Sequence, residues 1–84
     1  MKSEYDYTLS GVAVRALLSA RAPLRRRAEN VLDTLAADPF REPDFIEMAP
    51  SGRKYAVFVE RDTVVTLWVD HSEQEIRVVN VEFV

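Results

Sequence analysis

The chain has 84 residues and no cysteine, so disulfide frameworks, thiolate zinc sites and cysteine nucleophiles are excluded, and a single histidine disfavours other metal sites. At this length we expect one domain, residues 1–84, because compact domains usually contain about 100–150 residues. Hydrophobic residues make up 48% and charged residues 30%, a globular balance, and the formal net charge of −3 argues against a protein that coats nucleic acid indiscriminately.

The first half of the chain predicts a short strand followed by two helices. Residues 5–9 alternate weakly as in a strand, and Ser10 or Thr8 is placed to cap a helix over residues 12–20. Pro23 suits the first turn of a second helix, which Asp38-Pro39 ends, because the residue before proline is disfavoured in the α region. Apolar residues recur along this second helix at helical spacing, and the short connection favours an antiparallel helical hairpin. The residues at these spacings are Leu24, Ala28, Val31, Leu32 and Leu35.

The second half predicts three consecutive strands. The segments 54–60, 63–70 and 75–83 are rich in Val, Ile, Phe, Tyr and Trp, and hairpin-length gaps separate them. The loop that precedes them contains a further stretch, 45–48, which is either a short strand or an edge within the connection.

Alternation assigns side chains of these strands to the two faces of a sheet. In the last strand Val79, Val81 and Phe83 are expected to share one face, and in the middle strand Trp68 lies opposite Val65 and Leu67. The two helices are able to cover one face of this meander. We therefore predict an α+β fold in which a helical hairpin packs on a small antiparallel sheet, in the order β-α-α-β-β-β.

This order of elements resembles the RelE/ParE superfamily of type II toxin–antitoxin toxins. The resemblance is carried by the helix end at residues 32–39 and by the strand patterns at 54–59, 64–70 and 76–81, and it covers nearly the whole chain. It implies a single RelE/ParE-like domain and a toxin-like role. It also implies a cognate antitoxin as partner, with the ribosome and mRNA as further candidate partners.

The activity that the resemblance implies is ribosome-dependent mRNA cleavage, in which the 2′-hydroxyl attacks the adjacent phosphate. This reaction needs a base, an acid and cations that stabilise the charged phosphorane. The residues that resemble such a set are Arg61 and Arg77 as phosphate stabilisers and His71 and Glu73 as an acid/base pair. Two more cations, Arg53 and Lys54, are candidates for RNA or partner binding on a cationic sheet face. The alternatives without a catalytic role are that Arg61 is a turn arginine paired with Glu60 or Asp62, and that residues 71–74 form a solvated polar turn.

The charge of the chain is unevenly distributed. Residues 1–42 carry seven basic and six acidic side chains, a net +1, whereas residues 43–84 carry four basic and eight acidic ones, a net −4. The junction of the two predicted helices is the most basic region, and it either binds RNA phosphate or an acidic partner or forms a solvated helix face. Its arginines are Arg15, Arg21, Arg25, Arg26 and Arg27, and we assign the last four to RNA or partner binding.

Three functions remain open. The first is a toxin that binds the ribosome or mRNA and cleaves the message, and the second is a non-enzymatic inhibitor, as in the superfamily branch that poisons DNA gyrase. The third is a protein-binding member without activity. Residues 62–65 lack the Tyr-Arg pair with which the third strand of the family usually begins, so a non-enzymatic role stays open. We expect a cytoplasmic protein without a membrane segment, metal or cofactor, because the N-terminal residues carry no apolar signal and no apolar run approaches 20 residues.

Overall fold

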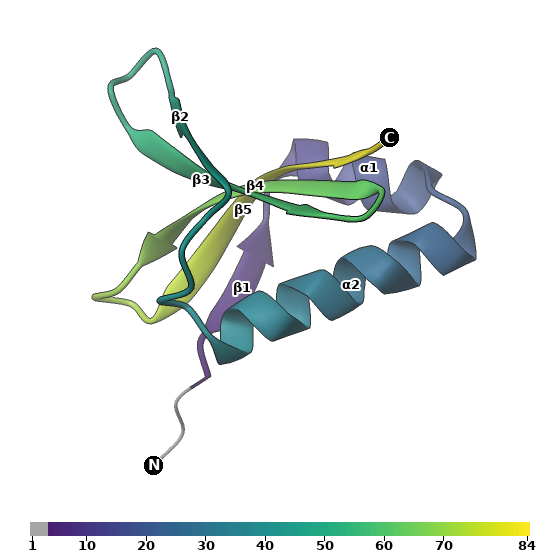
Figure 1. Ribbon diagram of the computed structural model, residues 1–84, viewed down its shortest axis with the longest axis horizontal. Coiled ribbons are helices and arrows are strands. Elements are labelled where there is room, and N and C mark those ends of the chain that lie inside the picture. The colour runs from purple at the N-terminus through teal and green to yellow at the C-terminus, as the bar shows by residue number, and fades with distance from the viewer. Residues whose placement is uncertain (1–3) are drawn as a thin grey trace.

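The computed structural model describes residues 4–84 and shows two helices packed on a five-stranded sheet (Figure 1). The α+β fold predicted from the sequence is therefore confirmed, with 45–48 as an additional edge strand. The elements in chain order are β1 (Asp6–Leu9), α1 (Gly11–Ser19), α2 (Ala22–Ala37), β2 (Phe45–Met48), β3 (Lys54–Glu60), β4 (Thr63–Asp70) and β5 (Glu75–Phe83).

The sheet is mixed, with the strand order β1-β5-β4-β3-β2. Strands β2 to β5 pair antiparallel through hairpins, but β1 pairs parallel with β5. The expectation of a wholly antiparallel sheet was wrong in this one pair. A hairpin forces its two strands to run in opposite directions, whereas the helices carry the chain away from β1 and leave its direction relative to β5 free.

Both helices begin and end within about one residue of the limits that the sequence predicts. The Ser10 hydroxyl accepts a hydrogen bond from the Ala13 N–H at 3.1 Å, so it caps α1, and it donates to the Val79 carbonyl of β5 at 2.6 Å. Helix α2 has Pro23 in its first turn and ends before Asp38. The cap at Ser10 therefore both starts α1 and ties that start to the sheet.

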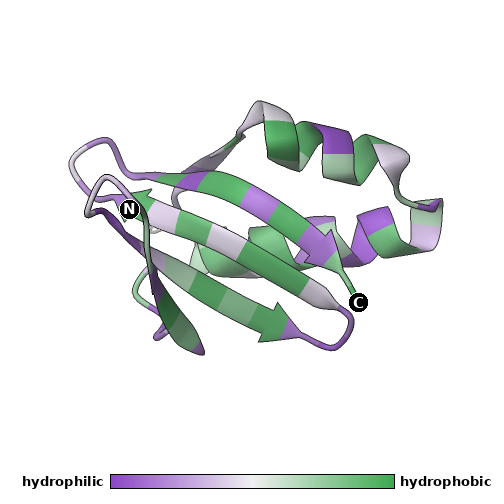
Figure 2. Cartoon of the chain, turned by 90° about the horizontal axis from the view of Figure 1, so that it is seen from above, coloured by the Kyte–Doolittle hydropathy of each residue, from purple (hydrophilic) through white to green (hydrophobic). Residues whose placement is uncertain are grey.

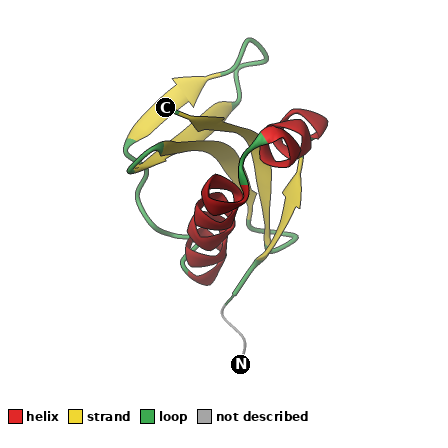
Figure 3. Ribbon diagram, turned by 90° about the vertical axis from the view of Figure 1, so that its right-hand side faces the viewer, coloured by secondary structure: helices red, strands yellow, loops and turns green. Residues whose placement is uncertain are grey.

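The core lies between the helices and one face of the sheet, and both helices cover that same face (Figure 3). Helix α1 contributes Ala13 and Leu17, and α2 contributes mainly Leu32 and Leu35. Along β5 hydrophobic and polar residues alternate for most of the strand in Figure 2, because successive side chains point to opposite faces, whereas β3 is hydrophobic over most of its length. The strand residues that are buried in this core are Phe58, Val65, Leu67, Ile76, Val78 and Val81.

A β-bulge interrupts the alternation in β5. The register with β4 shifts between Thr66 and Leu67, and this leaves Val79 without a partner in the ladder. Val81 and Phe83 consequently join the core, while Val79 does not. The prediction that these three side chains share one face was therefore wrong for Val79, because an inserted residue reverses the side-chain pattern on one side of the bulge.

Candidate functional site

A tryptophan cluster occupies the sheet face that the helices leave uncovered. Trp68 on β4 pairs with Arg77 on β5, and both lie between residues that face the core, so their side chains point away from the helices. The guanidinium carbon of Arg53 lies 3.9 Å from the Trp68 ring centroid, and that of Arg77 lies 5.4 Å from it. We call Arg53, Trp68 and Arg77 the tryptophan cluster. Two cations are held against one aromatic ring by cation–π attraction.

Two carboxylates balance the charge of this cluster. Arg77 Nη2 lies 3.0 Å from Glu75 Oε1 and 3.4 Å from Asp70 Oδ2. Asp70 also accepts hydrogen bonds from the Ser72 hydroxyl and the Glu73 N–H, and these, with the nearby Arg77, lower the pKa of its carboxyl. Within residues 4–84 the buried Nε of Arg77 finds no hydrogen-bond partner. Together with Asp70 and Glu75, the tryptophan cluster carries no net charge.

Lys54 lies next to Arg53 in sequence but belongs to the other face of the sheet. It begins β3 two residues before Ala56, which packs against the core, so alternation places Lys54 on the helix side. Among the cations predicted for the sheet, only Arg53 and Arg77 lie at the same place, against the Trp68 ring.

Arg61 is at the opposite end of β3 from Arg53. It is the first residue of the two-residue turn between β3 and β4, and its φ of 55° lies in the left-handed region. It lines a pocket of about 200 Å³ against Arg27 and Asn30 of α2. The structure therefore groups Arg61 with Arg27 of α2 and separates it from Arg77.

His71 and Glu73 lie in the β4–β5 turn, at the far end of β4 from Arg61. Eight residues of β4 separate the two turns, a distance of roughly 25 Å at the usual rise of a strand. His71 Nδ1 lies 3.1 Å from Tyr5 Oη, and the imidazole stacks on Phe40 with centroids 4.8 Å apart. No hydrogen bond joins His71 to Glu73 among residues 4–84. Of the four residues predicted for mRNA cleavage, Arg61 thus lies at one end of β4, whereas His71, Glu73 and Arg77 lie at or near the other end, where Asp70 contacts both Arg77 and the Glu73 N–H.

Exposed apolar side chains of α1 lie close in sequence to the arginines at the junction of α1 and α2. Leu18 is 71% exposed and Val14 is 38% exposed, although both belong to a helix that packs on the sheet by its other side. Arg25 is half-buried and its Nη1 donates to the Ala20 carbonyl at 3.4 Å, whereas the other arginines of the group are exposed. We call this region the helix-junction surface, and it consists of Val14, Leu18, Arg21, Arg25 and Arg26.

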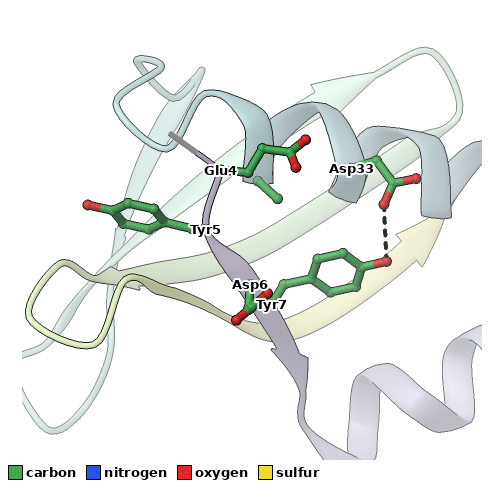
Figure 4. Close-up of a pocket in the computed structure, with 6 residues that line it drawn as sticks. Glu4, Tyr5, Asp6, Tyr7 and Asp33 are labelled. Atoms are coloured by element: carbon green, nitrogen blue, oxygen red, sulfur yellow. Dashed lines mark hydrogen bonds between the residues drawn. The ribbon is translucent and has the colours of Figure 1, made fainter. Parts of the chain in front are cut away.

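A third feature, a cleft beside β1, was not predicted. It has a volume of about 570 Å³, and carboxylates of Glu4, Asp6 and Asp33 lie around it (Figure 4). Tyr7 donates its hydroxyl hydrogen to Asp33 at 3.3 Å, and partial burial, followed by the Asp33 charge, raises the pKa of Tyr7. Within residues 4–84 no three His, Cys, Asp or Glu side chains are grouped to hold a metal ion, and neither helix is long and apolar enough to cross a membrane.

The sequence identified the cationic side chains but did not indicate which of them lie close together in the fold. The tryptophan cluster depends on the register between β4 and β5 and on the path of the chain before β3, neither of which a hydrophobic pattern reveals. The acidic cleft depends on the position of α2 beside β1. The alternation of Trp68 with core residues was the one available signal, since it marks the side chain as exposed on the other face.

Comparison with known proteins gives matches at the level of structure. No protein-family model matches the chain, and a search of curated proteins finds no relative. Among solved structures, the RelBE2 toxin–antitoxin complex of Mycobacterium tuberculosis matches with a TM-score of 0.81 and 12% identity, covering 96% of this chain and 92% of that one.

Two further structures match over similar lengths. The RelE–RelB complex of Pyrococcus horikoshii gives a TM-score of 0.73 at 17% identity and covers 99% of this chain and 96% of that one. The isolated RelE toxin of Escherichia coli gives 0.76 at 14% identity, covering 94% and 83%. Identities this low establish the shared architecture. The chain therefore has the fold of the RelE toxins.

Proposed function

We propose that this chain is the toxin-like component of a type II toxin–antitoxin system and that an antitoxin protein binds it in the cytoplasm. The shared fold with RelE toxins supports this function, and two of the matching structures are complexes of such toxins with RelB. The observation that carries the proposal within this chain is the helix-junction surface, which combines exposed apolar side chains of α1 with exposed arginines.

The chemistry of that surface specifies its partner. Leu18 and Val14 are separated by one helical turn, so a partner that covers both presents apolar side chains at matching spacing. Exposed Arg21 and Arg26 favour acidic residues beside those apolar ones, because guanidinium groups pair with carboxylates in bidentate geometry. An amphipathic acidic segment of an antitoxin fits both requirements.

We compare two modes by which the toxin-like chain inhibits its target. The first is inhibition of translation by mRNA cleavage on the ribosome. The tryptophan cluster supports RNA contact, because the Arg53 guanidinium over the Trp68 ring offers a planar cationic surface on which an unpaired base stacks. This mode requires that Arg61 or Arg77 stabilise the phosphorane and that His71 and Glu73 move protons. It places no demand on a metal or cofactor.

The second mode is inhibition by binding alone, either of the ribosome or of a target protein such as DNA gyrase. The distance of Arg61 from the other candidate catalytic residues favours this mode. His71 is also hydrogen-bonded to Tyr5, and Arg77 is paired with two carboxylates. General acid–base catalysis needs its groups within hydrogen-bond reach of one reacting centre. We therefore infer that the chain inhibits its target by binding.

Controlled expression in cells tests both levels of the proposal. Growth, cleavage of messages in translation and DNA supercoiling are followed after induction, with and without co-expression of the protein encoded beside this gene. Growth arrest that the neighbouring protein relieves supports a toxin–antitoxin pair, and normal growth in both cases refutes it. Message cleavage that Arg77→Gln abolishes favours the first mode. Arrest with intact messages favours binding, and lost supercoiling then points to gyrase.

A further inference from the structure

A small pocket lies between α2 and the turn that joins β3 to β4. Its volume is about 200 Å³, and α2 contributes residues three and four positions apart, which therefore lie on one side of the helix. The hairpin contributes the first turn residue together with the last residue of β3 and the first residue of β4. The pocket is lined by Arg27, Asn30 and Val31 from α2 and by Glu60, Arg61 and Thr63 from the hairpin.

The charges around this pocket do not balance. Arg27 forms an ion pair with Asp62, and Arg41 Nη2 lies 3.5 Å from Glu60 Oε1. The remaining guanidinium, that of Arg61, forms no ion pair with any of residues 4–84. Among the side chains that line the pocket and their ion-pair partners, three arginines and two carboxylates leave one positive charge, that of Arg61.

We propose that this pocket binds the carboxylate of a glutamate side chain from a protein partner. One unbalanced guanidinium matches one carboxylate, and the Asn30 amide is a second donor on the pocket wall. Val31 offers an apolar wall for the aliphatic stem of the glutamate. This inference deepens the proposed function, because the acidic partner it requires is the antitoxin.

A protein carboxylate fits this pocket better than an RNA phosphate does. The pocket and its ion-pair partners offer one unpaired guanidinium, which matches one added negative charge, whereas an RNA backbone brings several phosphates close to the Glu60 carboxylate. A single glutamate brings one negative charge and an apolar stem. The role of Arg61 is therefore partner binding at the helix layer, away from the tryptophan cluster.

The experiment uses the full chain labelled with ¹⁵N and follows the arginine Nε–H and asparagine amide resonances by NMR. The probe is the peptide acetyl-Leu-Glu-Glu-Leu-amide, and the matched peptides are its Gln-Gln counterpart and a short oligouridylate. We expect saturable shifts of the Arg61 and Asn30 resonances with the acidic peptide only. Equal shifts with the glutamine peptide, no shifts, or stronger binding of oligouridylate would overturn the proposal.

Arg61→Gly removes the guanidinium without endangering the fold, because glycine adopts a φ near 55° without strain. This variant should lose the peptide-induced shift at Asn30. The matched control is Arg15→Gln, which removes a guanidinium from the exposed side of α1 and should leave that shift unchanged. An Asn30 shift that persists in Arg61→Gly would overturn the proposal.

A second measurement keeps this inference separate from the proposed function. The dissociation constant for the protein encoded beside the gene is measured with the parent chain and with Arg61→Gly. A loss of about tenfold is expected when one charge-assisted contact is removed. Unchanged affinity refutes the pocket as an antitoxin contact. If the neighbouring protein fails to bind even the parent chain, the toxin–antitoxin assignment fails, and the peptide titration still decides whether the pocket holds a carboxylate.

Discussion

Two adjacent leucines on α1 allow a sharp test of the helix-junction surface. Leu17 is 7% exposed and belongs to the core, whereas Leu18 is 71% exposed. We predict that Leu18→Ala weakens binding of the antitoxin with little effect on the stability of the chain. Leu17→Ala is the matched control, since it removes the same atoms from the buried side of the same helix.

The magnitudes follow from these exposures. Full burial of a leucine side chain stabilises by about 1.5–3 kcal/mol. In the isolated chain Leu18 buries less than a third of its surface, so Leu18→Ala should lower the free energy of unfolding by under about 1 kcal/mol, and the better helix propensity of alanine offsets part of that loss. If a partner covers the exposed part, the binding free energy should weaken by about 1–2 kcal/mol, which corresponds to a loss of roughly fivefold to thirtyfold in affinity.

The buried neighbour behaves in the opposite way. Leu17→Ala should cost about 2–4 kcal/mol of stability, because it leaves a cavity in the core. That is a large share of the total for a chain of 84 residues, for which the free energy of unfolding is expected to be about 4–13 kcal/mol. Urea denaturation should therefore separate the two variants clearly.

The assay combines urea denaturation of the free chain with isothermal titration against the protein encoded beside the gene. An affinity of Leu18→Ala equal to that of the parent would show that no partner covers this surface. A large loss of stability in Leu18→Ala would contradict the exposed position of the side chain, on which the reasoning depends.

Three further predictions concern other parts of the molecule. Ser10→Ala removes the hydroxyl that caps α1 and bonds to β5, and it should lower the free energy of unfolding by about 1–2 kcal/mol in urea titrations. Hydrogen bonds and a nearby guanidinium lower the pKa of the Asp70 carboxyl in the folded chain. The charged carboxylate therefore stabilises the fold at pH values above the pKa of an ordinary carboxyl. This stabilisation is lost as the pH falls through the lowered pKa of the folded state. Asp70→Asn should therefore be less stable than the parent at about pH 6, and the gap should close toward about pH 2; a gap that does not change with pH contradicts this. Arg53→Ala removes the cation that lies 3.9 Å from the Trp68 ring centroid, and it should alter the fluorescence of this single tryptophan while changing stability by about 1 kcal/mol or less. An unaltered emission spectrum would show that the two side chains do not stack in solution.

Local signals in the sequence were sufficient for the order of β1, the two helices and the three C-terminal strands, and for their limits to within about one residue, but they left 45–48 undecided. Ser10 starts α1 because a hydroxyl at this position accepts from the backbone two or three residues on. Asp38-Pro39 ends α2 because proline restricts the residue before it. The three C-terminal strands follow from β-branched and aromatic runs separated by short polar turns. Each of these signals acts within a few residues of the chain.

Pairing across the sheet was beyond those local signals. The parallel contact between β1 and β5 joins residues about seventy positions apart, and no hairpin between them dictates the direction. The bulge at Val79 changes the faces of β5 without any proline or glycine to mark it. Such features depend on how the helices and the meander pack together, which a periodic pattern does not encode.

From its sequence alone this chain is an α+β protein with a basic helix junction and acidic strands, because residue types and their spacing act locally. Tertiary structure decides which charges meet. In the folded chain Arg53 and Arg77 lie against the same indole ring, and Arg61 lines a pocket beside α2. His71 contacts Tyr5 and Phe40. These groupings arise from strand register and from the side of the sheet that the helices cover, so they exist only once distant segments have packed.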